Sequence, residues 1–478
     1  MTTNNLRPNV VLAVCCLSLL LISMDVTIVN VALPAIRRDL GATTAGLEWV
    51  IDAYTLVLAS LLMLSGSIAD RFGRRRVFQL GLALFTGASA LCSLAPSLGV
   101  LIAFRMLQAV GASMLNPVAM SIITNVFVEP KARARAIGTW GAVVGVSMGL
   151  GPLVGGALTQ AIGWRSIFWI NLPIGLLALV LARLFVPESK AERARRADPV
   201  GQVLLFGGLL ALICAIIEGP RLGWNSLGVA ALFTVAAAAS VTLVLYEPRR
   251  AEPLLELRFF RSVPFASATL VAILAFAAFS GFLFLNALYL QEVRGMRPFQ
   301  TGLYTLPLAL ATVVCSPISG FLIGRGGTRV PLVLAGGGIA GSALLLAGLD
   351  GRTPLAHVVA AYVIFGVGFG LVNAPITNTA VSGMPRARAG LAAAIASTSR
   401  QVGASLGVAI GGTIAQGRHR AGAPLTDAMH TFFLLAAAAG LGIVLLGLLS
   451  STGWALATLR RAAALIEEGD RPATGRAS

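Results

Sequence analysis

The chain has 478 residues, of which 57% are hydrophobic and 12% are charged, and its formal net charge is +17. Soluble domains carry about a quarter charged residues, so a chain this apolar needs a membrane as its solvent. A positive charge of this size would also fit a nucleic-acid binder. However, the arginines lie in short groups between apolar runs rather than on one polar face, which excludes nucleic acid as a partner.

The apolar runs predict fourteen membrane-spanning helices, since each span needs about 20 mostly apolar residues. The first run extends to about Pro34, which is too long for the core of a signal peptide, so we expect it to be retained as a span. An even number of spans places both chain ends on one side of the membrane. In chain order, the predicted spans are 10–34, 46–67, 77–95, 99–122, 136–159, 166–186, 200–218, 227–246, 264–288, 302–323, 330–349, 356–381, 391–414 and 431–453.

The basic residues predict which side holds the two ends. Of the 36 lysines and arginines, 25 lie in segments on the side of the chain ends, and nine lie on the other side. Cytoplasmic loops carry the excess of positive charge, so we expect both termini in the cytoplasm and the protein in the cytoplasmic membrane. The same charge favours contact with anionic membrane lipid.

The sequence shows no sign of a metal, a cofactor or a catalytic centre. The five cysteines lie inside apolar runs without metal-ligand spacing, so we expect buried thiols and no disulfide. A phosphate-binding glycine loop with lysine is also absent from the sequence, which argues against ATP as the energy source. We therefore expect neither an enzyme nor a metal site.

A short repeat suggests two similar halves. Glycines and arginines in 66–75 recur 254 residues later in 320–329, although Gly324 stands where the first copy has an acid. Similar halves are typical of secondary transporters. We predict an all-α integral membrane fold of two six-helix bundles with two inserted helices. The predicted domains are a first bundle over 1–189, an insert over 190–261, a second bundle over 262–455 and a cytoplasmic tail over 456–478.

Three ionisable residues of the predicted first bundle lie well inside spans, where charge is costly and therefore a sign of function. Asp25, Asp52 and Arg105 all come to lie in the half of the membrane away from the termini, close enough in depth to interact. Buried carboxylates can load and release protons, whereas a structural ion pair would only fix helix packing. Glu48 and Glu218 lie at span ends, where we expect ordinary acids near water.

The segment after the second span is dense in charge and glycine. It can serve as a positive anchor of topology, or as a latch that joins the two bundles on the cytoplasmic side in one state and releases them in another. This loop motif consists of Gly66, Asp70, Arg71, Gly73, Arg74 and Arg75.

The fifth span carries small residues at steps of three and four, which places them on one face of a helix. Such a stripe lets a neighbouring helix approach closely. The stripe consists of Gly145, Gly149, Gly151, Pro152, Gly155 and Gly156.

These strings resemble those of a known family. The loop motif is similar to the conserved cytoplasmic loop of the major facilitator superfamily, and 105–112 resembles its fourth-span motif, with Ala109 where the family usually has glycine. The stripe of the fifth span resembles the antiporter motif of exporters. The segments 24–34, 164–175, 218–224 and 400–403 are similar to the branch of drug:proton antiporters with fourteen spans. The resemblance covers about residues 10–455.

The resemblance implies a proton-coupled antiporter that exports hydrophobic, often cationic, drugs or antibiotics by alternating access. Asp25 and Asp52 would bind the proton or cation, and Arg105 would couple the states. The open alternatives are an uptake or metabolite transporter of the same fold and, less favoured by the sequence, a membrane sensor or enzyme. Polar residues that we expect to line the substrate cavity are Gln108, Asn286, Asn373, Arg400 and Gln401.

Overall fold

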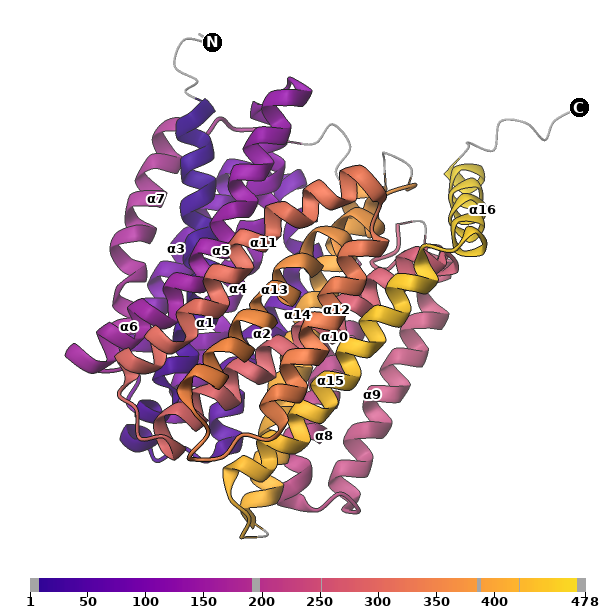
Figure 1. Ribbon diagram of the computed structural model, residues 1–478. Helices are drawn as coiled ribbons and strands as arrows, with labels where there is room; N and C mark the ends of the chain where they lie inside the picture. Colours follow the sequence, from indigo (N-terminus) through magenta and orange to yellow (C-terminus); the bar gives the residue numbers. More distant parts are fainter. Residues whose placement is uncertain (1–7, 191–197, 251, 385–387, 421, 471–478) are drawn as a thin grey trace, which may run out of the picture.

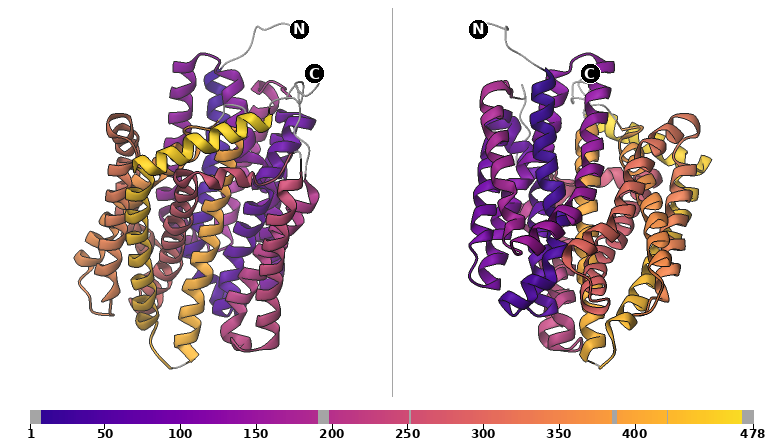
Figure 2. Two further views of the ribbon diagram at one scale, coloured as in Figure 1. Left: turned by 90° about the vertical axis from the view of Figure 1, so that its right-hand side faces the viewer. Right: turned by 60° about the vertical axis from the view of Figure 1, so that its left-hand side comes forward.

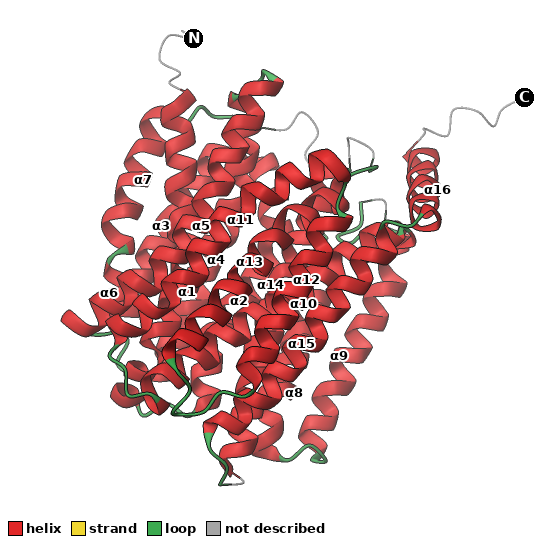
Figure 3. Ribbon diagram, in the orientation of Figure 1, coloured by secondary structure: helices red, strands yellow, loops and turns green. Residues whose placement is uncertain are grey.

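The computed structural model describes residues 8–190, 198–250, 252–384, 388–420 and 422–470, and this part of the chain consists of helices and loops without a strand (Figures 1 and 3). The predicted all-α fold is therefore confirmed. The first helices are α1 (Pro8–Leu40), α2 (Thr44–Phe72), α3 (Arg74–Ser93), α4 (Leu98–Val126), α5 (Pro130–Ala161), α6 (Ser166–Trp169) and α7 (Asn171–Phe185).

The insert and the second half follow. The inserted helices are α8 (Pro199–Leu222) and α9 (Leu227–Tyr246), and two short 3-10 turns, η1 (Glu247–Arg249) and η2 (Leu257–Arg261), lead onward. The remaining elements are α10 (Val263–Leu288), its continuation η3 (Tyr289–Val293), α11 (Pro298–Gly326), α12 (Arg329–Ala347), α13 (Leu355–Val381), α14 (Ala389–Arg420), α15 (Leu425–Ser450) and α16 (Gly453–Asp470).

Thirteen helical segments in the described chain are long and apolar enough to cross a membrane, with α6 and α7 counted as one. The helix α14 has 32 residues and packs among other spans, but Arg400 and Gln401 interrupt its apolar run. With α14 as a further span, the helices match the fourteen spans predicted from the sequence.

The helices run between two ends of the molecule. Figure 1 places the start of α1 and the whole of α16 at the same end, which we call the terminal end, and we call the opposite end distal. In the left view of Figure 2, α16 lies across the other helices. Ala455 and Ile466 of α16 are buried, while Trp454 and Arg461 are exposed, so only one side of this helix packs on the protein.

The helices form two groups with a seam between them. In the first half, α1 packs on α5, and α4 packs on α2 and α3; in the second, α10 packs on α14, α11 on α13 and α12 on α15. Across the seam, α5 packs on α11 and α2 on α14. The helix α8 contacts α2 and α14, and α9 packs on α8, so the insert is central in sequence but lies beside the seam rather than within it.

The two halves are joined in the distal half of the molecule. Arg37 Nη1 lies 2.7 Å from Glu292 Oε1, and Gln291 Nε2 donates to the carbonyl of Val31 at 2.8 Å. A cavity of about 10 Å³ lies between α5, α10 and α11. Toward the terminal end α5 and α11 diverge, since a Cβ added at 141 or 320 would meet no heavy atom within 4 Å. The conformation is closed at the distal end.

Candidate functional site

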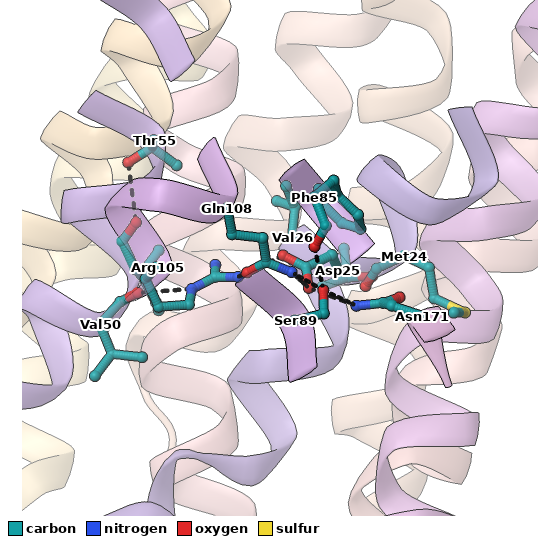
Figure 4. A network of polar contacts seen from close by, with 12 residues as sticks. Met24, Asp25, Val26, Val50, Thr55, Phe85, Ser89, Arg105, Gln108 and Asn171 are labelled. Carbon is teal, nitrogen blue, oxygen red and sulfur yellow. Dashed lines mark hydrogen bonds and ion pairs between the residues drawn. The ribbon is translucent and has the colours of Figure 1, made fainter. Parts of the chain in front are cut away.

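A buried polar network lies inside the first bundle and joins α1, α3, α4 and α7 (Figure 4). Its centre is the carboxylate of Asp25, which is fully buried. Arg105 Nη1 donates to Asp25 Oδ2 at 2.5 Å, and Gln108 Nε2 donates to Asp25 Oδ1 at 2.9 Å. Asn171 Nδ2 donates to the same Oδ1 at 3.1 Å. The carboxylate therefore accepts three hydrogen bonds, one of them from a full positive charge.

Gln108 connects several members of this network by hydrogen bonds. Its Oε1 accepts a hydrogen bond from Arg105 Nη1 at 2.6 Å, and its Nε2 also donates to Ser89 Oγ at 2.7 Å. Ser89 in turn donates to the carbonyl of Phe85 at 2.9 Å. Because both ends of the amide are used, the Gln108 side chain has one favourable orientation. In this conformation it belongs to the interior network, and its expected place in a substrate cavity stays a prediction.

Arg105 is held by more than the ion pair. Its Nε donates to the carbonyl of Val50 at 3.2 Å, and its guanidinium carbon lies 4.2 Å from the ring centroid of Tyr54. A cation over an aromatic face is stabilised further when water is excluded. Arg105 and Asp25 together carry no net charge, which lowers the free-energy cost of burying them in the membrane.

The second intramembrane acid lies elsewhere. Asp52 was expected to be close enough to Arg105 to interact, but its carboxylate points to the seam instead. Its Oδ1 accepts hydrogen bonds from Ser405 Oγ of α14 at 2.9 Å and from Thr55 Oγ1 at 3.4 Å, and its Oδ2 has no hydrogen-bond donor. The structure therefore separates the acids: Asp25 lies within the first bundle, and Asp52 bridges the two halves.

Glu48 also lies at the seam, and the expectation of an acid near water was wrong. The residue is fully buried, one turn before Asp52 on the same face of α2. Neither carboxylate oxygen has a hydrogen-bond partner among the residues that the structure describes. The side chain is pressed against Gly412 of α14, where an added Cβ would overlap the carboxyl group. The close approach of α14, which the position of Glu48 in α2 does not reveal, removes it from water.

The loop motif is held within the first half. Asp70 and Arg74 form an ion pair at 2.9 Å, and the backbone N–H of Arg75 donates to Glu188 Oε1 at 3.1 Å. Gly73 has a φ of +113°, and a Cβ there would lie 2.7 Å from Glu188 Oε1, so both the turn and the contact favour glycine. These contacts bind the loop to the end of α7 rather than to the second half. Gly66 lies near Pro117, and Arg71 lies over the ring of Phe72.

The small residues of α5 divide between two neighbours. A Cβ at Gly149 would lie 2.9 Å from Ala309, and one at Gly145 would lie 3.1 Å from Val313, both in α11. On another face, a Cβ at Gly155 would lie 3.0 Å from the carbonyl of Ile28 in α1. The remaining members follow the same division, with Pro152 and Gly156 on α11 and Gly151 on α1.

The other predicted cavity residues do not converge on one described pocket. Asn286 is buried inside the second half and accepts a hydrogen bond from Tyr362. Asn373 and Gln401 are half-buried. Arg400 donates to Thr377 Oγ1 at 2.5 Å and to Ser397 Oγ at 3.3 Å, and its Nε is buried without a partner. Among the eight ion pairs of the described chain, none involves Arg400.

Sequence reasoning did not assign roles to Ser89 and Asn171. Both contribute to the Asp25 network from α3 and α7, far from Asp25 in the sequence. Asn171 lies in the segment 164–175 that carried part of the family resemblance, which was the available signal. Ser89 is an ordinary polar residue inside a span, and nothing in its neighbourhood along the chain marks it.

Comparison with known proteins gives close relatives over most of the chain. The "Multidrug resistance protein Stp" of Mycobacterium tuberculosis is 39% identical over 403 residues, which cover 83% of this chain and 74% of the relative. The "Tetracenomycin C resistance and export protein" of Streptomyces glaucescens is 36% identical, covering 86% and 77% of the two chains. The "Multidrug efflux pump LfrA" of Mycolicibacterium smegmatis is 35% identical, covering 85% and 81%.

A solved structure has the same fold. The bacterial homolog to the human lysosomal transporter Spinster, in an inward-facing and occupied conformation, superposes with a TM-score of 0.62 at 18% identity, covering 97% of this chain and 98% of the other. The membrane-spanning helices and the relatives named above indicate an integral membrane transporter. The family model of the Major Facilitator Superfamily matches residues 15–408, and the chain belongs to that superfamily.

Proposed function

We propose that the protein exports drug-like molecules across the cytoplasmic membrane in exchange for protons. The observation that carries this proposal is the pair of acids in the membrane interior, Asp25 within the first bundle and Asp52 at the seam. Charged groups in such places persist where they are used. The names of the relatives, which include multidrug and antibiotic resistance proteins, support drug export.

The different surroundings of the two acids suggest different roles in transport. Asp25 is compensated by Arg105, so a proton that reaches Asp25 would break the ion pair and release the guanidinium. No ion pair of the described residues involves Asp52, and its hydrogen bond to Ser405 exists only while the two halves meet. In this scheme, protonation of Asp25 rearranges the polar network inside the first bundle. Protonation of Asp52 affects the contact between the two halves.

Alternating access needs two bodies that can rock against each other. The glycine contacts between α5 and α11 give a smooth seam in the distal half, while the same helices diverge toward the terminal end. Rocking about this seam would close the terminal end and open the distal end. We assign the terminal end to the cytoplasm because the segments there carry most of the arginine and lysine residues. The present conformation would then face the cytoplasm.

Arg400 is our candidate for substrate contact. The helix α14 is enclosed by α2 and α8 on one side and by α10, α13 and α15 on the other, so its half-buried arginine does not face lipid. Its described hydrogen bonds go to hydroxyl groups rather than to an acid. An arginine in this position favours a ligand with an acidic or strongly accepting group. An acidic substrate would differ in charge from the cationic substrates that the family resemblance implies. The substrate screen should therefore include both acidic and cationic drugs.

Growth tests decide between export and its alternatives. Cells that express the chain should tolerate higher concentrations of at least one drug than cells with an empty vector, and should accumulate less of that drug. Removal of the proton gradient should abolish the difference. Increased accumulation would support an uptake transporter of the same fold. Unchanged susceptibility across cationic, neutral and acidic drugs would favour a metabolite transporter.

A further inference from the structure

Glu48 is the most unusual acid in the described structure. It lies one turn from the distal end of α2, is fully buried, and has no hydrogen-bond partner at either oxygen. Gly412 of α14, the helix of the other half, lies against its carboxyl group. Ala409 and Ser405, which binds Asp52, come one and two turns earlier on α14. The carboxyl group of Glu48 is therefore enclosed by the contact between the two halves.

Among the described side chains, none supports a negative charge at this place. The ionisable groups that act on Glu48 are Asp52 on its own helix and Glu218 on α8, both acids, and Glu218 is already paired with Arg221 at 2.5 Å. On α4, Arg105 is engaged with Asp25 of α1. A carboxylate removed from water and from cations favours its protonated form. An ionised Glu48 would thus oppose the contact between α2 and α14.

We propose that Glu48 is a proton-binding residue of the distal gate: the distal end closes only when Glu48 holds a proton, and it opens when that proton leaves. This inference rests on the proposed alternating access. When α14 moves away, Glu48 meets water at the distal end and ionises there. When the gate closes, a proton from the same water returns to the carboxylate.

The position of Glu48 separates its role from that of the transported proton. No described opening leads from this seam to the terminal end in the closed conformation, since the residue and its neighbours are buried. The proton of Glu48 is therefore taken from and returned to the distal side. It does not add to the number of protons exchanged per substrate. Its effect is to make distal closure depend on the pH of that side.

The gate can be observed without a substrate. Spin labels at Leu94, 72% exposed beyond α3, and at Ala356, exposed at the start of α13, report the distal separation of the two halves in a background without the five native cysteines. Double electron–electron resonance should find the short distance at about pH 5.5 and a growing long-distance population toward about pH 8.5. In Glu48→Gln, a permanently neutral side chain should keep the short distance as the major population at the higher pH.

Two further variants serve as controls for this interpretation. Gly412→Ala places a methyl group on the carboxyl of Glu48 and should increase the long-distance population at every pH. Asp427→Asn removes an exposed acid at the same end and should leave the pH response unchanged. The proposal is overturned if Glu48→Gln opens with pH as the unaltered chain does, or if the unaltered chain shows no pH response. Because no transport is measured, either result leaves proton-driven export to be judged on its own assay.

Discussion

Arg105 Nη1 lies 2.5 Å from Asp25 Oδ2, and both side chains are almost completely inaccessible to solvent. These two buried charges of the first bundle thus neutralise each other. The sequence left open whether Asp25 forms an ion pair, and the structure pairs it with Arg105. Any proton that binds Asp25 competes with an arginine, so proton binding and the position of Arg105 are coupled.

This pair predicts a characteristic pattern of stability. Arg105→Gln leaves a buried carboxylate without its cation and should destabilise the protein by about 3–5 kcal/mol. The double variant Asp25→Asn with Arg105→Gln removes both charges and should recover much of that loss, while transport stays abolished. Thermal unfolding in detergent measures the cycle. If the stability losses of Asp25→Asn and Arg105→Gln simply added up in the double variant, the ion pair would contribute nothing to the stability of the folded state.

The seam between α5 and α11 should be sensitive to added volume. Gly156→Ala places a methyl group against the carbonyl of Pro298, and strain of this kind costs about 1–3 kcal/mol. We expect export to fall by about tenfold or more because the distal end closes less often. Gly87→Ala on α3, away from this seam, meets no atom within 4 Å and is the control. Similar export by both variants would remove the role assigned to the stripe.

The charged loop provides a third test. Asp70→Asn breaks the ion pair with Arg74, so we expect transport to be lost while the protein stays in the membrane. Arg76→Gln is the control, because that side chain is 72% exposed and lies 3.8 Å from Glu188. Drug accumulation and membrane immunoblots measure both outcomes. Normal export by Asp70→Asn would indicate that the loop only sets the topology of the chain in the membrane.

The sequence predicted more of the fold than of the site. Runs of apolar residues determine spans, so the helices and the close approach at the fifth span could be read from spacing alone. Depth along α1 and α4 also brought Asp25 and Arg105 together. Depth says nothing about direction around a helix, however, and so Asp52 was not expected to face Ser405.

Contacts between distant segments also could not be predicted from the sequence. Gln108 was expected in a cavity, but its partners come from α1 and α3 as well as from its own helix. Glu48 was expected near water because one helix end was considered by itself. Its burial depends on Gly412, which lies 364 positions later in the printed sequence. Such packing between helices leaves no local pattern that could have predicted it.

Arg400 yields a prediction about substrate charge. Arg400→Gln should reduce protection against the carboxylic acid nalidixic acid by about tenfold, which corresponds to one charge-assisted hydrogen bond, and should affect the cation ethidium much less. Arg400→Lys should restore part of the protection because the positive charge is kept. Growth inhibition with matched expression levels measures the difference. Equal loss of both activities in the two variants would indicate that Arg400 maintains the fold of α14 instead.

Proton movement that accompanies export tests the central claim most directly. Purified protein in liposomes that contain a pH-sensitive dye, with a drug gradient identified from the growth tests and no initial pH gradient, should move protons against the drug flow. Asp25→Asn should abolish this proton signal and pH-driven export together, and Asp25→Glu should retain part of both. Drug movement without proton movement in the unaltered chain, or an unimpaired proton signal in Asp25→Asn, would contradict the account.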